Sequence, residues 1–335
     1  MHARTAVADG RLAYLGSISL SPDSTTYNRE VGLILSEEPR LPSGIGAPVD
    51  TVTMSAAVSG FEPGRVPTMK WCRFQAGQSA SYGLVEDETV IEVAGSPFAE
   101  YTQTGTRYPL AQVKLLPPVI PPVLYAAGPN YRGHLEGMAK RRGEPPRYPA
   151  RPEPKLRSPN ALIGTEENIV VPKDCSGAVQ PEGQLAVVIG KRARNVSRDE
   201  ALDCVLGYSI GNDVSQREWQ RTDRTLFRAK NCDTFKPFGP WIVTGLDPGK
   251  LRITVRHNGT VWESFSSADQ IWDTATWIHE MSKTATLHPG DVLWMGTEGA
   301  DGDMVPGDVI EVEISGIGIL RNYVVAEVQG MAHAE

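Results

Sequence analysis

EGQLAVVIGKRARNVSRDEALDCVLGYSIGNDVSQ, residues 182–216, is the stretch that decides the fold. Its β-branched run over 184–189 is ended by a glycine, and this pattern predicts a buried strand. Residues 208–214 predict a second strand. Because Glu182 immediately precedes the first run and Asp213 ends the apolar run over 208–211, each predicted strand carries a carboxylate at its edge.

The rest of the chain shows strand and turn signals more often than helical ones. Ser197 and Glu200, three residues apart, predict a capping box that starts a helix, and Gly207 is expected to end that helix. A strand-rich α+β fold, with a mixed β roll or barrel-like core and few helices, fits this pattern better than alternating strands and helices. The further elements expected are a strand over 122–127, a hairpin over 252–257 and 260–265 with a type I′ turn at Asn258-Gly259, a helix that Ser267 caps and that runs through Met281, strands after Pro289-Gly290-Asp291 and Pro306-Gly307-Asp308, and a last strand over 318–325.

Differences in composition predict the domain organisation. Residues 1–68 are rich in Ser, Pro, Gly and Thr without a sustained period, so we expect a poorly ordered extension, or a protein whose true first residue is Met69. Alternating, strand-like residues over 69–116 predict a small N-terminal α/β region. The proline-rich stretch 116–122 is expected to be a stiff linker, because each proline fixes φ. The main, catalytic domain is expected over 120–330.

The bulk composition excludes several classes of protein. The chain has 335 residues and a formal net charge of −7, so neither a nucleic acid nor an anionic membrane is an expected partner. No apolar run approaches the roughly 20 residues of a membrane span. The basic cluster Lys140-Arg141-Arg142 is interpreted as a solvated helix end. Unpaired cysteine spacing predicts reduced thiols and a cytoplasmic protein; the cysteines are Cys72, Cys175, Cys204 and Cys232.

Residues that could carry chemistry lie near the predicted strand ends. The sequence has no GxGxxG, P-loop, HExxH or GxSxG motif. His134 follows an apolar strand through Gly128-Pro129-Asn130, which is typical of a site on a loop held by a rigid sheet. Because an unpaired buried charge is costly, Glu182 and Asp213 need either a salt bridge or a hard cation such as Mg²⁺. Lys230 is either a surface lysine or a cation that holds a substrate carboxylate.

Several ordered blocks together resemble the fumarylacetoacetate hydrolase superfamily, in its acylpyruvate hydrolase and 2-hydroxyhepta-2,4-diene-1,7-dioate isomerase-like branch. Residues 182–216 resemble the central signature of that superfamily nearly throughout. The resemblance covers about 120–326, with a weaker match from Met69. The other matching blocks are Asn130-Tyr131 with His134, 157–164 (RSPNALIG), Lys230 with Asp233-Thr234-Phe235, 237–244 (PFGPWIVT), 293–297 (LWMGT) and 316–322 (GIGILRN).

The resemblance implies a mixed β-sandwich roll, a homodimer, and action on small 2-oxo acids, often in the breakdown of aromatic compounds. It implies a Mg²⁺ or Mn²⁺ ion held by an E-x-E pair and an aspartate, which correspond here to Glu182, Gln184 and Asp213. It also implies that His134 lies in a mobile lid and acts as a base on water. The residues expected to contact substrate are Tyr131, Arg157, Lys230 and Thr297.

Two positions depart from the superfamily pattern. Gln184 stands where the second glutamate is expected, so the protein charge offered to the metal falls from three negatives to two, and we expect a weaker metal site. Hydrolytic members that use a His–Glu pair place the glutamate three residues after the histidine, where this chain has Gly137. Glu136 would serve only if the lid is not a regular helix, because residues i and i+2 do not share a helix face.

Hydrolysis of a C–C bond in an acylpyruvate-type acid is the expected reaction, with His134, Lys230 and Glu136 as candidate catalytic residues. The absence of a glutamate at the position of Gly137 affects only hydrolysis, because only hydrolysis needs an activated water. A decarboxylase, tautomerase, isomerase or hydratase acting on a 2-oxo acid is therefore the alternative. A metal-poor paralogue that serves as a binding or structural subunit is a further alternative.

Overall fold

The computed structural model describes residues 4–8, 11–15, 67–299 and 302–328. The chain forms two units, Met1–Gly60 and Phe61–Glu335. In the first unit, strands β1 (Arg4–Ala8) and β2 (Arg11–Leu15) pair antiparallel. The expectation of a poorly ordered extension over 1–68 falls mostly outside the described residues.

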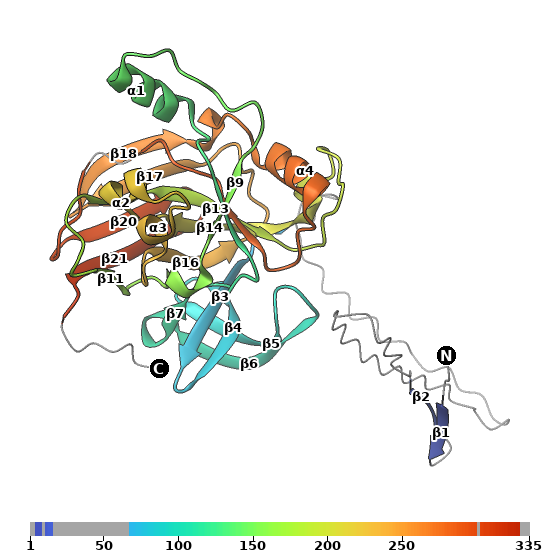
Figure 1. Ribbon diagram of the computed structural model, residues 1–335. Coiled ribbons are helices and arrows are strands. Elements are labelled where there is room, and N and C mark those ends of the chain that lie inside the picture. Colours follow the sequence, from blue (N-terminus) through green and yellow to red (C-terminus); the bar gives the residue numbers. More distant parts are fainter. Residues whose placement is uncertain (1–3, 9–10, 16–66, 300–301, 329–335) are drawn as a thin grey trace, which may run out of the picture. The chain divides into compact units, whose positions relative to one another are not determined.

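The second unit is strand-rich and contains a large mixed sheet (Figure 1). Most neighbouring strands of this 12-stranded sheet are antiparallel, while β8 runs parallel to β19. Its main path runs in the order β6-β5-β4-β3-β16-β14-β13-β19-β8-β9. The strands are β3 (Lys70–Ala76), β4 (Ser79–Glu86), β5 (Thr89–Gly95), β6 (Tyr101–Pro109), β7 (Lys114–Leu116), β8 (Leu124–Ala127), β9 (Pro154–Arg157), β10 (Leu162–Ile163), β13 (Gly183–Ile189), β14 (Val205–Asn212), β16 (Lys236–Val243) and β19 (Val292–Trp294).

A second sheet of five strands packs on the first, and the order of its strands is β11-β21-β20-β17-β18. These strands are β11 (Asn168–Val171), β17 (Arg252–His257), β18 (Thr260–Ser266), β20 (Val309–Ile314) and β21 (Gly318–Ala326), and the short pair β12 (Val179–Gln180) and β15 (Ser215–Gln216) forms a separate ladder. The described helices are α1 (Arg132–Arg142), α2 (Arg217–Thr222), α3 (Phe227–Asn231) and α4 (Thr274–Thr284), with 3-10 turns at Leu110–Gln112, Pro159–Ala161, Ala201–Cys204 and Ser267–Asp269.

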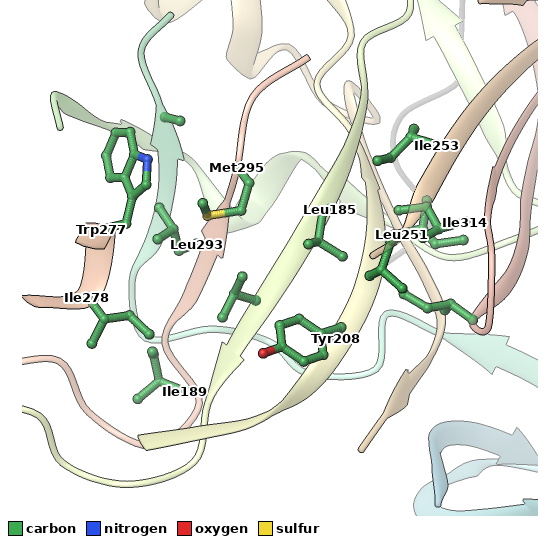
Figure 2. Packing of buried hydrophobic residues seen from close by; sticks show 14 of the residues in the cluster. Leu185, Ile189, Tyr208, Leu251, Ile253, Trp277, Ile278, Leu293, Met295 and Ile314 are labelled. Carbon is green, nitrogen blue, oxygen red and sulfur yellow. The ribbon is translucent and has the colours of Figure 1, made fainter. Parts of the chain in front are cut away.

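Strand β13 is buried along its whole length and separates two parts of the core. Leu185, Val187 and Ile189 pack into one cluster, whereas Ala186 and Val188 pack into another. Successive side chains of a strand point to opposite faces, so a strand covered on both faces needs a continuous apolar run. Figure 2 shows the first cluster, where β13 meets the second sheet and α4; the labelled residues beyond β13 are Tyr208, Leu251, Ile253, Trp277, Ile278, Leu293, Met295 and Ile314.

Most predicted strands are confirmed, and so is the predicted hairpin turn. The hairpin turn has positive φ at both central residues, 48° at Asn258 and 80° at Gly259, as a type I′ turn requires. All four cysteines are free. Lys140-Arg141-Arg142 forms the exposed last turn of α1. No helix among the described residues is both long and apolar enough to span a membrane.

The two capping predictions need correction. Ser197 and Glu200 exchange the expected hydrogen bonds, but only a 3-10 turn follows, because β14 begins at Val205. The Cys204 carbonyl oxygen accepts hydrogen bonds from the N–H groups of Gly190 and Lys191, which directly follow β13. The chain therefore re-enters the sheet at once, and no longer helix forms. Ser267 caps no long helix: Ser266 caps the 3-10 turn and Asp273 caps α4.

Candidate active site

All the predicted site residues except Tyr131 and Glu136 line one small cavity of about 90 Å³. The cavity lies at one end of the central strands of the large sheet, where β13 begins and where β14, β19 and β8 end. Antiparallel pairing of β13 and β14 sets Gly183 opposite Asn212, so the carboxylates just outside these strands become neighbours. The predicted residues in the lining are His134, Arg157, Glu182, Gln184, Asp213, Lys230 and Thr297.

Lys230 links the two carboxylates. Its Nζ atom, on α3, lies 2.7 Å from Glu182 Oε2 and 3.0 Å from Asp213 Oδ2, and it also donates to Ser215 Oγ at 2.6 Å. The side chain is only 5% exposed. Lys230 is therefore a buried member of the site, and the alternative of a surface lysine is excluded.

Asp213 is surrounded by cations. Arg157 donates through Nε and Nη2 to the two carboxylate oxygens, and Lys236 Nζ lies 2.8 Å from Oδ1. Burial alone would raise the pKa of Asp213, but Arg157, Lys230 and Lys236 together hold it well below the ordinary value. The carboxylate is thus ionised at any physiological pH, and the salt-bridge alternative from the sequence describes these contacts.

Lys236 belongs to the site but is absent from the sequence predictions. It is the first residue of β16, fully buried, and it donates to the carbonyl oxygens of Val214 and Phe235 as well as to Asp213. Burial lowers its pKa to about 7, against the attraction of Asp213. The signal that would have found it is a lysine inside an otherwise apolar strand, which requires a buried partner.

Glu182 has two cationic partners. Its Oε2 atom accepts from Lys230, and its Oε1 atom lies 2.7 Å from Arg217 Nη1 at the start of α2. Burial opposes ionisation, but Lys230 and Arg217 lower the pKa of Glu182 to about 2. Both carboxylates of the site are therefore charged at physiological pH.

Gln184 is held in one orientation. Its Oε1 atom accepts the Gly296 N–H at 2.8 Å, so its amide nitrogen faces Glu182 Oε2 at 3.4 Å. A reversed amide would set its NH2 group against the Gly296 N–H, donor to donor. The side chain therefore offers the carboxylate pair a hydrogen-bond donor, where a glutamate would offer an oxygen.

His134 lies in the first turn of α1 and lines the cavity. Its Nδ1 atom lies 2.8 Å from the Glu298 carbonyl oxygen, which can only accept, so Nδ1 carries the proton and Nε2 has the free lone pair. Burial lowers the pKa of His134. The neutral ring is thus suited to accept a proton.

Tyr131 and Glu136 lie away from the cavity. The Tyr131 ring is fully buried and packs edge-on against Phe265 with 5.0 Å between centroids, and its hydroxyl accepts from Gln270 at 3.2 Å. Glu136 is exposed and accepts a 2.7 Å hydrogen bond from Tyr148. Because α1 is a regular helix, Glu136 does not share the face of His134.

A larger cavity of about 1170 Å³ adjoins the small one. His134, Glu182 and Gln220 line both. Gly137, one turn after His134, lines the larger cavity as well. A ligand whose head is bound among the cations would therefore extend past His134 into open space.

The oxygen donors of the site determine whether it fits a divalent cation. Among the residues described, no group of three or more His, Cys, Asp or Glu side chains is placed to hold a metal. However, Glu182 and Asp213 converge on one cation already, the Lys230 ammonium. Mg²⁺ in proteins is commonly held by one or two carboxylates, with water and substrate completing its shell. The two carboxylates fit such an ion, and Gln184, with its nitrogen toward the pair, adds no ligand oxygen.

Comparisons with known proteins agree with this architecture. Residues 123–325 match the family described as fumarylacetoacetate (FAA) hydrolase, C-terminal, and residues 69–118 match the family described as Rv2993c-like, N-terminal. Protein Rv2993c of Mycobacterium tuberculosis is 39% identical over 246 residues, which cover 72% of this chain and 90% of that protein. Oxaloacetate tautomerase YisK of Bacillus subtilis is 32% identical over 229 residues, 65% of this chain and 75% of that protein.

Solved structures of similar fold include both isomerases and hydrolases. The 2-hydroxyhepta-2,4-diene-1,7-dioate isomerase from Mycobacterium marinum superposes with a TM-score of 0.70 at 35% identity, covering 78% of this chain and 100% of that one. Maleylpyruvate hydrolase from Sphingobium sp. SYK-6, in complex with manganese(II) and pyruvate, superposes with a TM-score of 0.63 at 27% identity and the same coverage.

Proposed function

The chain belongs to the fumarylacetoacetate hydrolase family, and from that premise we propose that it is a divalent-metal-dependent enzyme that tautomerises or isomerises a small 2-oxo acid. The carrying observation is an excess of positive charge around two carboxylates. Glu182 and Asp213 face four basic side chains in direct contact, and Lys155 also lines the cavity. The contacting basic residues are Arg157, Arg217, Lys230 and Lys236. Such a site favours an anion of small size.

Glu182 and Asp213 are the residues that would hold Mg²⁺ or Mn²⁺. When bound, that ion would supply Lewis-acid stabilisation of negative charge on the 2-oxo oxygen. Lys230 is in contact with both carboxylates, and it would donate one of its hydrogen bonds to the substrate carboxylate instead. A metal held by two charges instead of three gains more from an anionic substrate, which brings its own oxygen donors.

His134 would move the proton. Its free Nε2 atom can remove a proton from the carbon next to the 2-oxo group and return it elsewhere, because the ring is neutral and lines the cavity. Tautomerisation needs only this one group. Glu136 is directed to Tyr148 and Gly137 has no side chain, so the lid helix supplies no second acid to orient an attacking water.

Hydrolysis of an acylpyruvate-type acid is the second candidate. The larger cavity favours it, because an acyl group and a water molecule would both fit beyond His134. The relation to maleylpyruvate hydrolase supports the same candidate.

A product-resolved assay tests the proposal. With Mn²⁺, oxaloacetate is expected to relax between its keto and enol forms faster than without protein, with no pyruvate formed above the blank. His134→Gln should lower kcat by roughly 10²–10⁴-fold, as expected for loss of a general base. His279→Gln is the matched control, since His279 has the same kind of Nδ1 contact to a carbonyl, that of Val196, but lies on α4. Release of pyruvate and a carboxylic acid from acylpyruvates would favour the second candidate, and no turnover of any 2-oxo acid would refute both.

Thermal unfolding tests the metal. Because the site is rich in cations, Mn²⁺ alone is expected to raise the Tm little, oxalate alone somewhat more, and both together by more than the sum of the two shifts. Removal of Mn²⁺ by a chelator should reverse the combined shift. No shift at millimolar Mn²⁺ with oxalate would contradict the metal and support a metal-poor, non-catalytic paralogue.

A further inference from the structure

Glu298 is a carboxylate of the site that sequence reasoning did not identify. It follows Thr297, lines the larger cavity, and its side chain lies against the first turn of α1. Burial raises the pKa of this carboxylate, and the backbone N–H groups of His134 and Gly133 beside it lower that pKa. A Cβ added at Gly133 would lie only 2.6 Å from Glu298 Oε2, so the glycine permits this close approach.

Two separate parts of Glu298 hold the same histidine. Its carboxylate lies beside the His134 backbone N–H, and its carbonyl oxygen accepts from the His134 ring at 2.8 Å. Within the described helix α1, the N-cap Tyr131 makes no side-chain capping bond and the first turn has no acidic residue. The free N–H groups at a helix start need acceptors, and a negative charge there is favourable. Glu298 supplies that acceptor from another segment of the chain.

We propose that Glu298 is the positioning residue of the lid, which fixes the first turn of α1 and so holds the His134 ring over the cavity. The assignment of His134 as the base rests on the proposed function, whereas the contacts of Glu298 with α1 do not. Loss of the carboxylate should fray the first turn and release the ring into water.

Hydrogen exchange of backbone amides tests the contact directly. In Glu298→Ala, the amides of Gly133 and His134 should exchange at least roughly tenfold faster, because a charged acceptor is lost. Gly133→Ala removes the same contact from the other partner and should have the same effect. Glu136→Gln removes a carboxylate from α1 itself that bonds outward to Tyr148, so these two amides should keep their protection.

The tautomer of His134 provides a readout that a general loss of stability would not change. Nitrogen chemical shifts should show the Nδ1–H form in the native protein and a mixture of both forms in Glu298→Ala, because the ring nitrogen that carries the proton is set by the partner of Nδ1. Glu298→Gln retains one acceptor oxygen and should restore part of the native signal. In the assay, kcat should fall in Glu298→Ala while KM changes little.

These outcomes separate the two proposals. Unchanged exchange and an unchanged tautomer in both Glu298→Ala and Gly133→Ala would overturn the assignment of Glu298, even if the native protein turns over 2-oxo acids. Faster exchange and a mixed tautomer would uphold it, even if no 2-oxo acid is turned over and the proposed function fails.

Discussion

At Gln184, the orientation of one amide group determines which atom faces the carboxylate pair. The Gly296 N–H takes its oxygen, so its nitrogen is directed to Glu182. A glutamate at the same position would satisfy Gly296 with one oxygen and present the other to the pair. In the proposed metal site, glutamine at this position would therefore remove a ligand oxygen as well as a charge, with an otherwise similar side chain.

Gln184→Glu is expected to tighten Mn²⁺ binding by about tenfold or more. A unit charge about 4 Å away contributes about 4 kcal/mol at an effective dielectric constant of 20, and desolvation offsets only part of this. Titration calorimetry measures the change. Gln220→Glu is the matched control, because Gln220 lines the same cavity but accepts from Arg217 and does not touch Glu182 or Asp213 in any contact of the described residues. Equal gains in both variants would mean a general charge effect, and no gain at Gln184 would show that the ligand assignment is wrong.

Among the elements, strands were predicted better than helices. Strand β13 has the continuous apolar run that its burial on both faces requires, and the Asn258-Gly259 turn is determined by two adjacent residues. The helix expected after Ser197 does not form, because a capping box indicates only where a helix can start and not how long it is. Its length depends on where β14 must begin, which is set by pairing with β13 across the sheet.

The same limit applies to the site. Glu182 and Asp213 carry a local signal, since each is a charge beside an apolar run. Their meeting with Arg157 and Lys230 depends on the order of strands in the sheet, which the sequence indicated only through resemblance to a family. Glu298 has no local signal at all, because its partner is the backbone of α1.

Helix α1 has room for the glutamate that hydrolytic family members are expected to carry at the position of Gly137. Gly137 lies one turn after His134 and lines the larger cavity, and the nearest atom to an added Cβ is Arg141 Nη1 at 3.6 Å. Gly137→Glu should therefore fit, share the face of His134 and raise the ratio of C–C hydrolysis to tautomerisation by roughly tenfold or more. Products from an acylpyruvate measure the ratio.

Gly137→Ala is the control for helix stability in this experiment. It should strengthen α1 by up to about 1 kcal/mol without adding a carboxylate, so the product ratio should stay the same. A ratio that rises equally in both variants would point to lid rigidity as the cause, and one that rises in neither would show that hydrolysis is not limited by the missing acid.

Across the whole molecule, the site joins segments that are far apart in the chain. Lys230 is 48 residues from Glu182, and Arg157 is 56 residues from Asp213. Their ion pairs exist only while the large sheet is intact, so the protonation of these carboxylates is coupled to global unfolding. Breaking a buried pair by removing one charge costs about 3–5 kcal/mol, because the partner remains buried and unpaired.

Stability should therefore fall steeply in acid, and Glu182 identifies part of the loss. Its pKa is about 2 in the folded protein, against 4.5 as the ordinary value. Between these values the unfolded chain binds more protons than the folded one, so the free energy of unfolding rises with pH there and is constant above about pH 5. The contribution of Glu182 is about 3 kcal/mol, fully present at pH 7 and lost progressively between about pH 4.5 and 2.

Urea unfolding of the native protein and of Glu182→Gln at several pH values measures this contribution. The difference in free energy between the two proteins should be largest above pH 5 and shrink toward pH 2, while Glu280→Gln, an exposed partner of Lys283, should show a small difference throughout. A difference between the native protein and Glu182→Gln that stays constant from pH 7 to pH 2.5 would mean that the Glu182 carboxylate is not held in its charged form by Lys230 and Arg217.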